Sequence, residues 1–292
     1  MRKHIWPIII FFKILLFYIP ILKRVLKFMG FYSPGKMLDT TYAIKTYMLH
    51  QNAYDQFCNT ASSKKTMLEI GPGGSNLSSF IAHLKGFSRS FLIDIEPLQK
   101  NVLKNSEDNF NKIKFYLLGN KNFHPDESLK IMGFNDVNYE HMSEGTSSLE
   151  RLPSNSIDFL WSHSVLQHIH INAFDKLLKE MHRVLKPDGI MSHKIDLKDC
   201  IAYGLNNMRF SENVWHSDLF FNSGFYTNRI RKDELLNYFV LNDFEIIKEE
   251  HTFFDEIPLQ ISSCSKDIQQ KYSLNDLKYS GLHCILKKNN YD

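Results

Sequence analysis

The sequence lacks a cysteine framework. Four of its 292 residues are cysteines, and they lie far apart without any CxxC pair: Cys58, Cys200, Cys264 and Cys284. Disulfide-dense scaffolds are short and secreted, with closely spaced cysteines. We therefore expect four reduced thiols in a cytosolic protein.

An excess of charge of one sign is also missing. The chain has 35 Lys and Arg against 32 Asp and Glu, a net charge of +3. This balance argues against nucleic-acid binding by bulk charge. The 13 glycines and 9 prolines are too few for a collagen-like or low-complexity chain. With 43% hydrophobic and 23% charged residues, the composition is that of a globular chain and excludes a polytopic membrane protein.

Acidic residues are absent from the first part of the chain, where none precedes Asp39. Residues 5–22 are apolar except for Lys13, and three basic residues follow them: Lys23, Arg24 and Lys27. A run of 18 residues is the lower limit for spanning a hydrocarbon core of about 30 Å. Pro7, Pro20 and Lys13 weaken a spanning helix.

Residues 1–30 are therefore predicted to form a membrane-associating helix, lying among the headgroups of an anionic leaflet. A true span and a buried or oligomer-forming helix remain alternatives. The basic residues that follow the run place the rest of the chain on the cytosolic side.

Beyond a helical lead-in at residues 31–60, strand and helix patterns alternate. Strands are expected at 66–70, 90–94, 137–141, 157–162, 190–195, 244–249 and 282–287. Helices are expected at 38–58, 76–85, 97–118, 172–185 and 231–240, with a turn at 186–189. This alternation predicts one α/β domain over residues 61–292, a doubly wound and mostly parallel sheet with an irregular insertion at 119–136.

A glycine-rich turn follows the first expected strand and begins a helix, and Asp94 ends the second strand. Such a turn lets the backbone approach a nucleotide, and the acid can accept hydrogen bonds from ribose hydroxyls. Asn76 stands where a dinucleotide-binding loop has its third glycine, which counts against a nicotinamide- or flavin-dependent enzyme. The lysine of a phosphate-binding Walker loop is also missing.

Three segments carry a family resemblance. Glu69-Ile70-Gly71-Pro72-Gly73 resembles motif I of the class I S-adenosylmethionine-dependent methyltransferases, and residues 156–169 and 181–189 resemble their fourth strand and the turn into the fifth. The chain is similar to type 11-like members over about residues 60–290. The resemblance implies a seven-stranded Rossmann-like sheet with an antiparallel last strand, S-adenosylmethionine as cofactor, and methyl transfer.

The resemblance also implies cofactor contacts. Motif I would line the methionine part, Asp94 would hold the ribose, and the segment before Leu152-Pro153 would reach the adenine. The full set implied is Glu69, Gly71, Gly73, Asp94, Ser148, Leu149, Ser162 and His163. Ser148 stands where many members have an acid, and Gln167 replaces a frequent Glu. No metal is expected, because the histidines at 163, 168 and 170 lack the pattern of a closed zinc site.

Residues 197–231 follow the fifth strand and belong on the acceptor side. They resemble a subgroup of methyltransferases acting on bacterial surface polysaccharides and glycoconjugates, although Cys200 stands where that subgroup usually has His. A hydroxyl acceptor needs a base, for which the candidates are Asp196, preferred, with His193 and His163. The candidates for holding the acceptor are Arg209, Tyr226, Asn228 and Arg229. Each of these has a purely structural alternative.

The predicted function is transfer of a methyl group from S-adenosylmethionine to a hydroxyl of a sugar or lipid-linked glycan. The enzyme would be cytoplasmic, peripheral or monotopic on the inner face of the cell membrane. Its expected partners are a small-molecule or lipid-linked glycan substrate and the membrane surface, without nucleic acid. The alternatives are a lipid, quinone or amine acceptor, and a non-catalytic cofactor-binding scaffold of a membrane glycan assembly.

Overall fold

A computed structural model describes residues 6–19, 36–58, 64–119 and 132–289. The expected basic residues after the apolar run, Lys23, Arg24 and Lys27, lie outside the described residues, as does most of the expected insertion.

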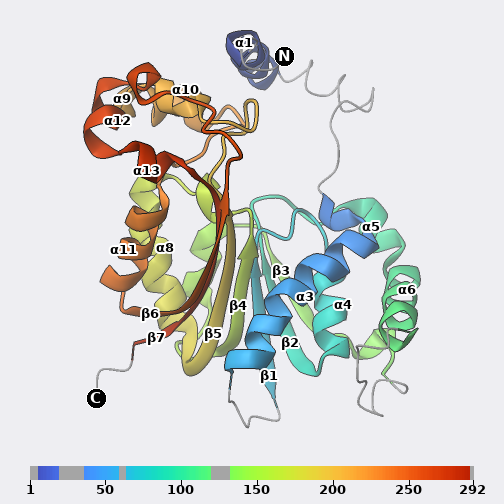
Figure 1. The fold of residues 1–292 in the computed structure, drawn as a ribbon. Helices are drawn as coiled ribbons and strands as arrows, with labels where there is room; N and C mark the ends of the chain where they lie inside the picture. The colour runs from blue at the N-terminus through green and yellow to red at the C-terminus, as the bar shows by residue number, and fades with distance from the viewer. Residues whose placement is uncertain (1–5, 20–35, 59–63, 120–131, 290–292) are drawn as a thin grey trace.

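The centre of the fold is a seven-stranded sheet with the order β3-β2-β1-β4-β5-β7-β6 (Figure 1). Its strands are β1 (Lys65–Ile70), β2 (Phe87–Ile93), β3 (Tyr139–Met142), β4 (Ile157–His163), β5 (Leu185–Asp196), β6 (Phe244–Phe253) and β7 (Tyr279–Lys288). All neighbours pair in parallel except β7, which is antiparallel to β5 and β6. The predicted seven-stranded, mostly parallel sheet is confirmed.

Helices cover both faces of the sheet, and each face has its own apolar core. On one face lie α3 (Thr40–Phe57), α4 (Leu77–Leu84), α5 (Lys100–Lys104) and α6 (Ser106–Gly119). On the other lie α8 (Ile171–Val184) and α11 (Lys232–Leu241). The strands between them are buried on both sides, which explains their nearly continuous apolar runs.

Shorter elements sit at the ends of the strands. They are η2 (Lys36–Leu38), η3 (Phe134–Asp136), η4 (Gly145–Arg151), η5 (Leu166–His168), η6 (Asn206–Arg209), α9 (Glu212–Trp215), α10 (Asp218–Phe221), η7 (Ile261–Ser263), α12 (Lys266–Lys271) and α13 (Leu274–Leu277). Most of the elements after η5 form a lobe above the carboxyl ends of β4 and β5 (Figure 1).

Two predicted boundaries were wrong. The helix expected at 97–118 is broken at Asn105: α5 ends at Lys104, and α6 begins at Ser106 with Glu107 and Asp108 in its first turn, where acidic side chains favour a helix start. The turn expected at 186–189 is a bulge within β5. Leu185 pairs with Ile157, yet the next paired residue of β5 is Ile190.

The N-terminal helix α1 (Trp6–Tyr18) packs on the lobe rather than on the sheet. Ile10 is buried in a cluster with Trp215, Phe220, Phe225 and Tyr226. Figure 1 shows α1 beside α10 at the upper end of the molecule. Among the described residues, no helix has both the length and the apolar character needed to cross a membrane.

One buried arginine ties this lobe to the sheet. Arg231, which is 1% exposed, donates to the Leu197 carbonyl at 2.7 Å, to the Asp276 carbonyl at 3.2 Å and to the Tyr279 carbonyl. These three carbonyls lie at the end of β5, in α13 and at the start of β7. The guanidinium therefore satisfies three backbone acceptors where the lobe begins and ends.

We predict that Arg231→Met lowers the free energy of unfolding by about 3–5 kcal/mol, because it leaves three buried carbonyls without donors. Arg89→Met is the control. Arg89 forms an exposed ion pair with Glu140 at 3.0 Å, and its loss should cost about 0–1 kcal/mol. Urea denaturation of both variants measures the difference, and equal losses would contradict the role given to Arg231.

Candidate active site

A cavity of about 450 Å³ opens at the carboxyl ends of β1, β2 and β4. Its lining residues are Ile70, Gly71, Gly73, Ile93, Asp94, Ile95, Gly145, Thr146, Ser164, Val165, His168, Ile169, His170, Ala173 and Phe221. In a doubly wound sheet this edge is where ligands bind. Three of the predicted cofactor residues, Gly71, Gly73 and Asp94, thus share one cavity wall.

Gly71 is the point of closest approach between the two loops that form the cavity. Its φ is +80°, and a Cβ there would lie 2.2 Å from Cγ2 of Val165. Its N–H donates to the Ile93 carbonyl at 2.8 Å. Only glycine combines this conformation with so little space, so the motif keeps bare backbone beside the cavity.

The Asp94 carboxylate joins the ends of β1 and β2. Oδ2 accepts from the Gly73 N–H at 2.8 Å, and Oδ1 accepts from Ile95 and Glu96 N–H groups at 2.7 and 3.1 Å. These bonds hold the carboxylate at the cavity wall. A side chain placed so can accept hydrogen bonds from ribose hydroxyls.

Glu69 supports the glycine loop from behind. It is 1% exposed, accepts a hydrogen bond from the Ser78 hydroxyl of α4, and does not line the cavity. Burial raises the pKa of its carboxyl to about 8. Its contact with Ser78 fixes the start of α4 against the end of β1.

The two residues predicted to contact the adenine lie apart from the cavity lining. Ser148 and Leu149 are both fully buried within η4 and do not line the cavity, whereas Gly145 and Thr146 do. The sequence signal for this wall was the glycine that follows the third strand, with a φ of +62°. Val165, after β4, and Phe221, in α10, also line the cavity and were missed, since single apolar side chains carry no motif.

Ser162 and His193 face away from His163, because successive residues of a strand point to opposite faces. The Ser162 hydroxyl lies 2.8 Å from Nδ1 of His193, whose ring stacks on Phe239 at 6.2 Å. Both are fully buried, and burial lowers the pKa of His193 to about 3. His193 is therefore a neutral core histidine in this position.

His163 is partly exposed at the end of β4, on the face covered by α3. Its Nδ1 lies 3.1 Å from Nε2 of His50, and its ring meets the Tyr42 ring edge-on at 6.5 Å. Within the described part of the chain, its Nε2 has no hydrogen bond. Burial lowers the pKa of His163 to about 4, so the ring is neutral at neutral pH, and Nε2 carries a free lone pair in the tautomer whose Nδ1 donates to His50.

The other candidate base, Asp196, ends β5 and is one-third exposed. Its Oδ1 accepts from the Lys198 N–H at 3.0 Å, and its Oδ2 lies 3.6 Å from the Lys198 ammonium. Nearby Cys200 is a thiol at neutral pH, because burial raises its pKa to about 11. The following Asp199 uses its carboxylate to cap four backbone N–H groups of the loop up to Asn206.

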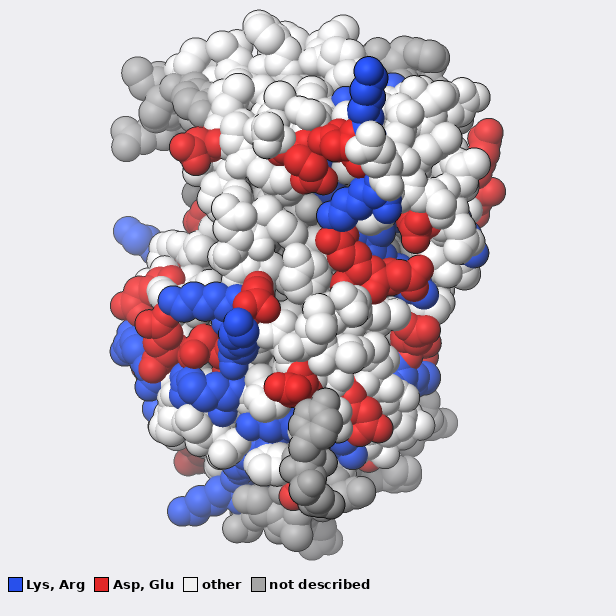
Figure 2. Space-filling view, turned by 90° about the vertical axis from the view of Figure 1, so that its left-hand side faces the viewer, with Lys and Arg blue, Asp and Glu red and all other residues white. Residues whose placement is uncertain are grey.

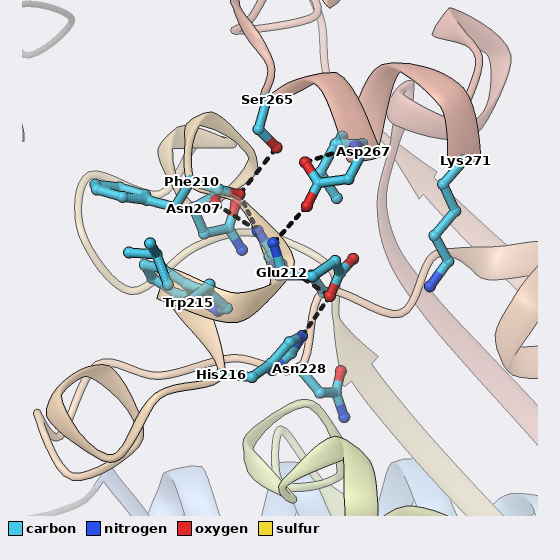
Figure 3. A network of polar contacts seen from close by, with 12 residues as sticks. Asn207, Phe210, Glu212, Trp215, His216, Asn228, Ser265, Asp267 and Lys271 are labelled. Carbon is cyan, nitrogen blue, oxygen red and sulfur yellow. Dashed lines mark hydrogen bonds and ion pairs between the residues drawn. The ribbon is translucent and has the colours of Figure 1, made fainter.

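A polar network around Glu212 and His216 holds the lobe together (Figure 3), and Arg229 belongs to it. Its guanidinium donates to the carbonyls of Asn207 at 3.1 Å and Phe210 at 2.7 Å, and pairs with Glu212 at 3.0 Å. His216 contacts the same carboxylate at 2.7 Å, and the pKa of Glu212 falls to about 2. The structure thus places Arg229, 4% exposed, inside a network that joins η6 to α9.

Tyr226 and Asn228 position the wall of the cavity. The Asn228 amide donates to the carbonyls of Leu166 at 2.8 Å and Ile169 at 3.2 Å. Nδ1 of His168 donates to the Tyr226 carbonyl at 2.7 Å. These contacts fix the loop after β4. Tyr226 and Asn228 therefore shape the cavity by holding this loop in position.

Arg209 of the predicted acceptor set contacts the N-terminal helix. Its guanidinium lies over the Trp6 ring at 5.2 Å, and its Nε is 3.4 Å from the Asn206 amide oxygen. Among the described residues, no group of three or more His, Cys, Asp or Glu side chains is arranged to hold a metal ion.

Comparisons with known proteins agree with this geometry. Residues 68–192 match the family described as a methyltransferase domain. No curated protein matches the chain in sequence.

The fold is similar to several solved structures at low identity. An S-adenosylmethionine-dependent methyltransferase from Archaeoglobus fulgidus is 13% identical, with 83% of this chain and 93% of that chain covered and a TM-score of 0.46. Geranyl diphosphate C-methyltransferase from Streptomyces coelicolor A3(2) is 14% identical, with 85% and 80% covered and a TM-score of 0.47. The 1,6-didemethyltoxoflavin-N1-methyltransferase from Burkholderia thailandensis is 10% identical, with 86% and 87% covered and a TM-score of 0.43.

We predict that Gly71→Ala weakens binding of S-adenosylhomocysteine by at least about tenfold, because the new Cβ forces the two loops of the cavity apart. Gly86→Ala is the matched control: Gly86 has a φ of +86°, but a Cβ there meets no atom within 4 Å. Calorimetric titration compares the two. Equal affinities in both variants would show that the close approach at Gly71 does not shape the site.

Proposed function

The chain is a class I S-adenosylmethionine-dependent methyltransferase, and from that premise we propose that it methylates a hydroxyl of a sugar or lipid-linked glycan at the cytosolic face of a membrane. The observation that carries this proposal is the position of α1, which packs one face on the acceptor-side lobe and exposes an apolar opposite face.

The outer face of α1 is apolar. Its exposed large apolar side chains are Ile8, Phe11, Phe12 and Leu15, with Phe11 63% and Phe12 54% exposed, and the exposed Ile19 directly follows the helix. Their spacing of three and four residues places them on one side of the helix. A helix of this kind can bury its outer face among lipid headgroups and acyl chains.

Lys13 is the one charged residue of α1, and it points inward. Its ammonium donates to the Cys200 carbonyl at 2.5 Å and lies over the Phe225 ring at 5.7 Å. The charge that weakens a spanning helix thus joins α1 to the acceptor-side segment. The face directed outward is left without charge.

The surrounding surface continues this apolar face. In Figure 2 the uppermost edge of the molecule is uncharged, and the charged side chains lie below it. Leu219 and Phe221 of α10 are 43% and 38% exposed, and Phe221 also lines the cavity. A membrane against this end would lie close to the cavity that holds the cofactor, which favours an acceptor anchored in lipid.

Bound S-adenosylmethionine supplies the methyl group on a sulfonium leaving group. The glycine loop and Asp94 orient it, and alignment of acceptor, methyl carbon and sulfur gives most of the catalysis. We assign the proton of the acceptor hydroxyl to His163, whose Nε2 is free. Asp196 is the second candidate, because its carboxylate already contacts the N–H and the ammonium of Lys198.

The alternatives make different demands. An amine acceptor needs no such base, so His163→Asn and Asp196→Asn would leave its methylation largely intact. A lipid or quinone acceptor would use the same apolar end without sugar contacts. A non-catalytic scaffold would bind the cofactor without turnover.

We predict that vesicles containing a polyprenyl-diphosphate-linked hexose accept tritium from methyl-labelled S-adenosylmethionine, as an ether stable to alkali. The double variant Phe11→Glu/Phe12→Glu should lose vesicle flotation and lower the transfer by at least about tenfold, because two large side chains no longer enter the bilayer. Phe115→Glu is the control, since Phe115 is 81% exposed on α6, remote from α1.

All three proteins should bind S-adenosylhomocysteine equally. Methylation of a water-soluble hexose at the same rate, unaffected by the α1 substitutions, would overturn the membrane proposal. Label released by alkali or found on an amine would overturn the hydroxyl acceptor.

A further inference from the structure

A row of polar side chains crosses the sheet on the face covered by α3. Strand pairing aligns His163 of β4 with Lys194 of β5, then His283 of β7 and Glu250 of β6. His50 of α3 is fully buried against this row. A buried polar row in an otherwise apolar face is costly unless its members are hydrogen-bonded to one another.

The buried groups form a continuous chain of contacts. From His163, Nδ1 lies 3.1 Å from Nε2 of His50, and Nδ1 of His50 lies 2.8 Å from the Ser192 hydroxyl. That hydroxyl lies 3.0 Å from Nε2 of His283, whose Nδ1 is 3.6 Å from Oε2 of Glu250, an ion-pair contact that is longer than a hydrogen bond. Glu250 is half exposed, so this chain of contacts runs from His163, which precedes the cavity-lining Ser164, to solvent.

We propose that His50, Ser192 and His283 form a proton path from His163 to Glu250. This inference rests on the proposed transfer to a hydroxyl, because only an acceptor that loses a proton needs such a path. His163 touches the acceptor and is the catalytic base. The other members act through it.

Every link is compatible with one direction of transfer. Each imidazole can accept a proton at one nitrogen and release one from the other, and a serine hydroxyl can do both. In the resting state His163, His50 and His283 all carry hydrogen on Nδ1, and Ser192 donates to Nε2 of His283. Nε2 of His163 is then the free proton acceptor at the substrate end of the path.

The transfer balances as follows. The acceptor oxygen forms a bond to the methyl carbon, the carbon–sulfur bond breaks, and its electron pair neutralises the sulfonium. The acceptor proton moves to Nε2 of His163, and the Nδ1 proton of His163 passes to His50. One proton shifts at each further link, and the last reaches Glu250 and then water.

The surroundings explain why a path is needed. Burial lowers the pKa of His50 and His283 as well as that of His163, and the Lys194 ammonium lowers those of all three further. On the outer side Lys248 pairs with Glu250 at 2.8 Å and keeps it a carboxylate. An imidazolium is therefore unstable inside, whereas a proton delivered to Glu250 leaves at once.

The other buried contact between a histidine and a serine offers no such route. His193 and Ser162 lie on the opposite face, and the ring of His193 stacks against Phe239. Nε2 of His193 is buried without a partner in the described residues. The path is thus specific to the face that contains His163.

The first test is the tautomeric state of the histidines, measured by nitrogen-15 NMR on the full chain with S-adenosylhomocysteine at neutral pH. We expect His163, His50 and His283 to be neutral with hydrogen on Nδ1. Ser192→Ala should convert His50 to a mixture of tautomers, because it removes the oxygen that accepts from Nδ1. Hydrogen on Nε2 of His50 in the unchanged protein, or a charged ring at any of the three, would overturn the path.

The second test is kinetic, with vesicles of the polyprenyl-diphosphate-linked hexose. Ser192→Ala and Glu250→Gln should lower kcat by at least about tenfold at low buffer concentration, without changing KM, and added imidazole should restore part of the rate. Glu249→Gln is the matched control, because Glu249 precedes Glu250 on β6 and pairs with Cys284, outside the row.

Unchanged, buffer-independent kcat in both variants would overturn the path even with the expected tautomers. If the unchanged protein does not methylate this acceptor, the proposed function fails there, and the tautomers alone decide whether the path exists.

Discussion

The structure depends on how closely two loops approach at the carboxyl edge of the sheet. Gly71 at the end of β1 touches Val165 after β4, with no room for a side chain between them. Asp94 at the end of β2 then reaches the Gly73 N–H across the loop. Three parallel strands thereby end in one wall of closely packed backbone and one carboxylate, which suits a nucleoside carrying an amino acid. Rigid elements position such a wall more accurately than free loops could.

Above this wall, most of the polar side chains hold structure rather than substrate. Arg229 and Asn228 donate hydrogen bonds to backbone carbonyls. Lys13 of the N-terminal helix also donates to a backbone carbonyl, that of Cys200. The lobe, the loop after β4 and α1 are consequently one assembly around the cavity. A membrane that takes up the outer face of α1 would act directly on the acceptor side, because Lys13 and Ile10 of α1 contact that side.

The fold was predictable from the sequence because strands buried on both faces read as short apolar runs, and the glycine loop and Asp94 have fixed positions in such a sheet. The candidate site was predictable only in part. Gly71, Gly73 and Asp94 line the cavity, whereas Arg229 and His193 are buried in the protein. From the sequence alone, such an arginine or histidine could equally stabilise the core or bind a substrate. His50 gave no signal, since its role arises from α3 crossing β4 and β5, a contact between residues more than a hundred positions apart.

The central claim is that Asp94 and the glycine loop form the S-adenosylmethionine site. Calorimetric titration of the full chain with S-adenosylhomocysteine, beside an Asp94→Ala variant, tests it most directly. The account predicts micromolar binding that falls by at least about tenfold in the variant, since a carboxylate that accepts hydrogen bonds from ribose hydroxyls is lost. Equal affinity of the two proteins, or no binding to the folded unchanged chain, would contradict it.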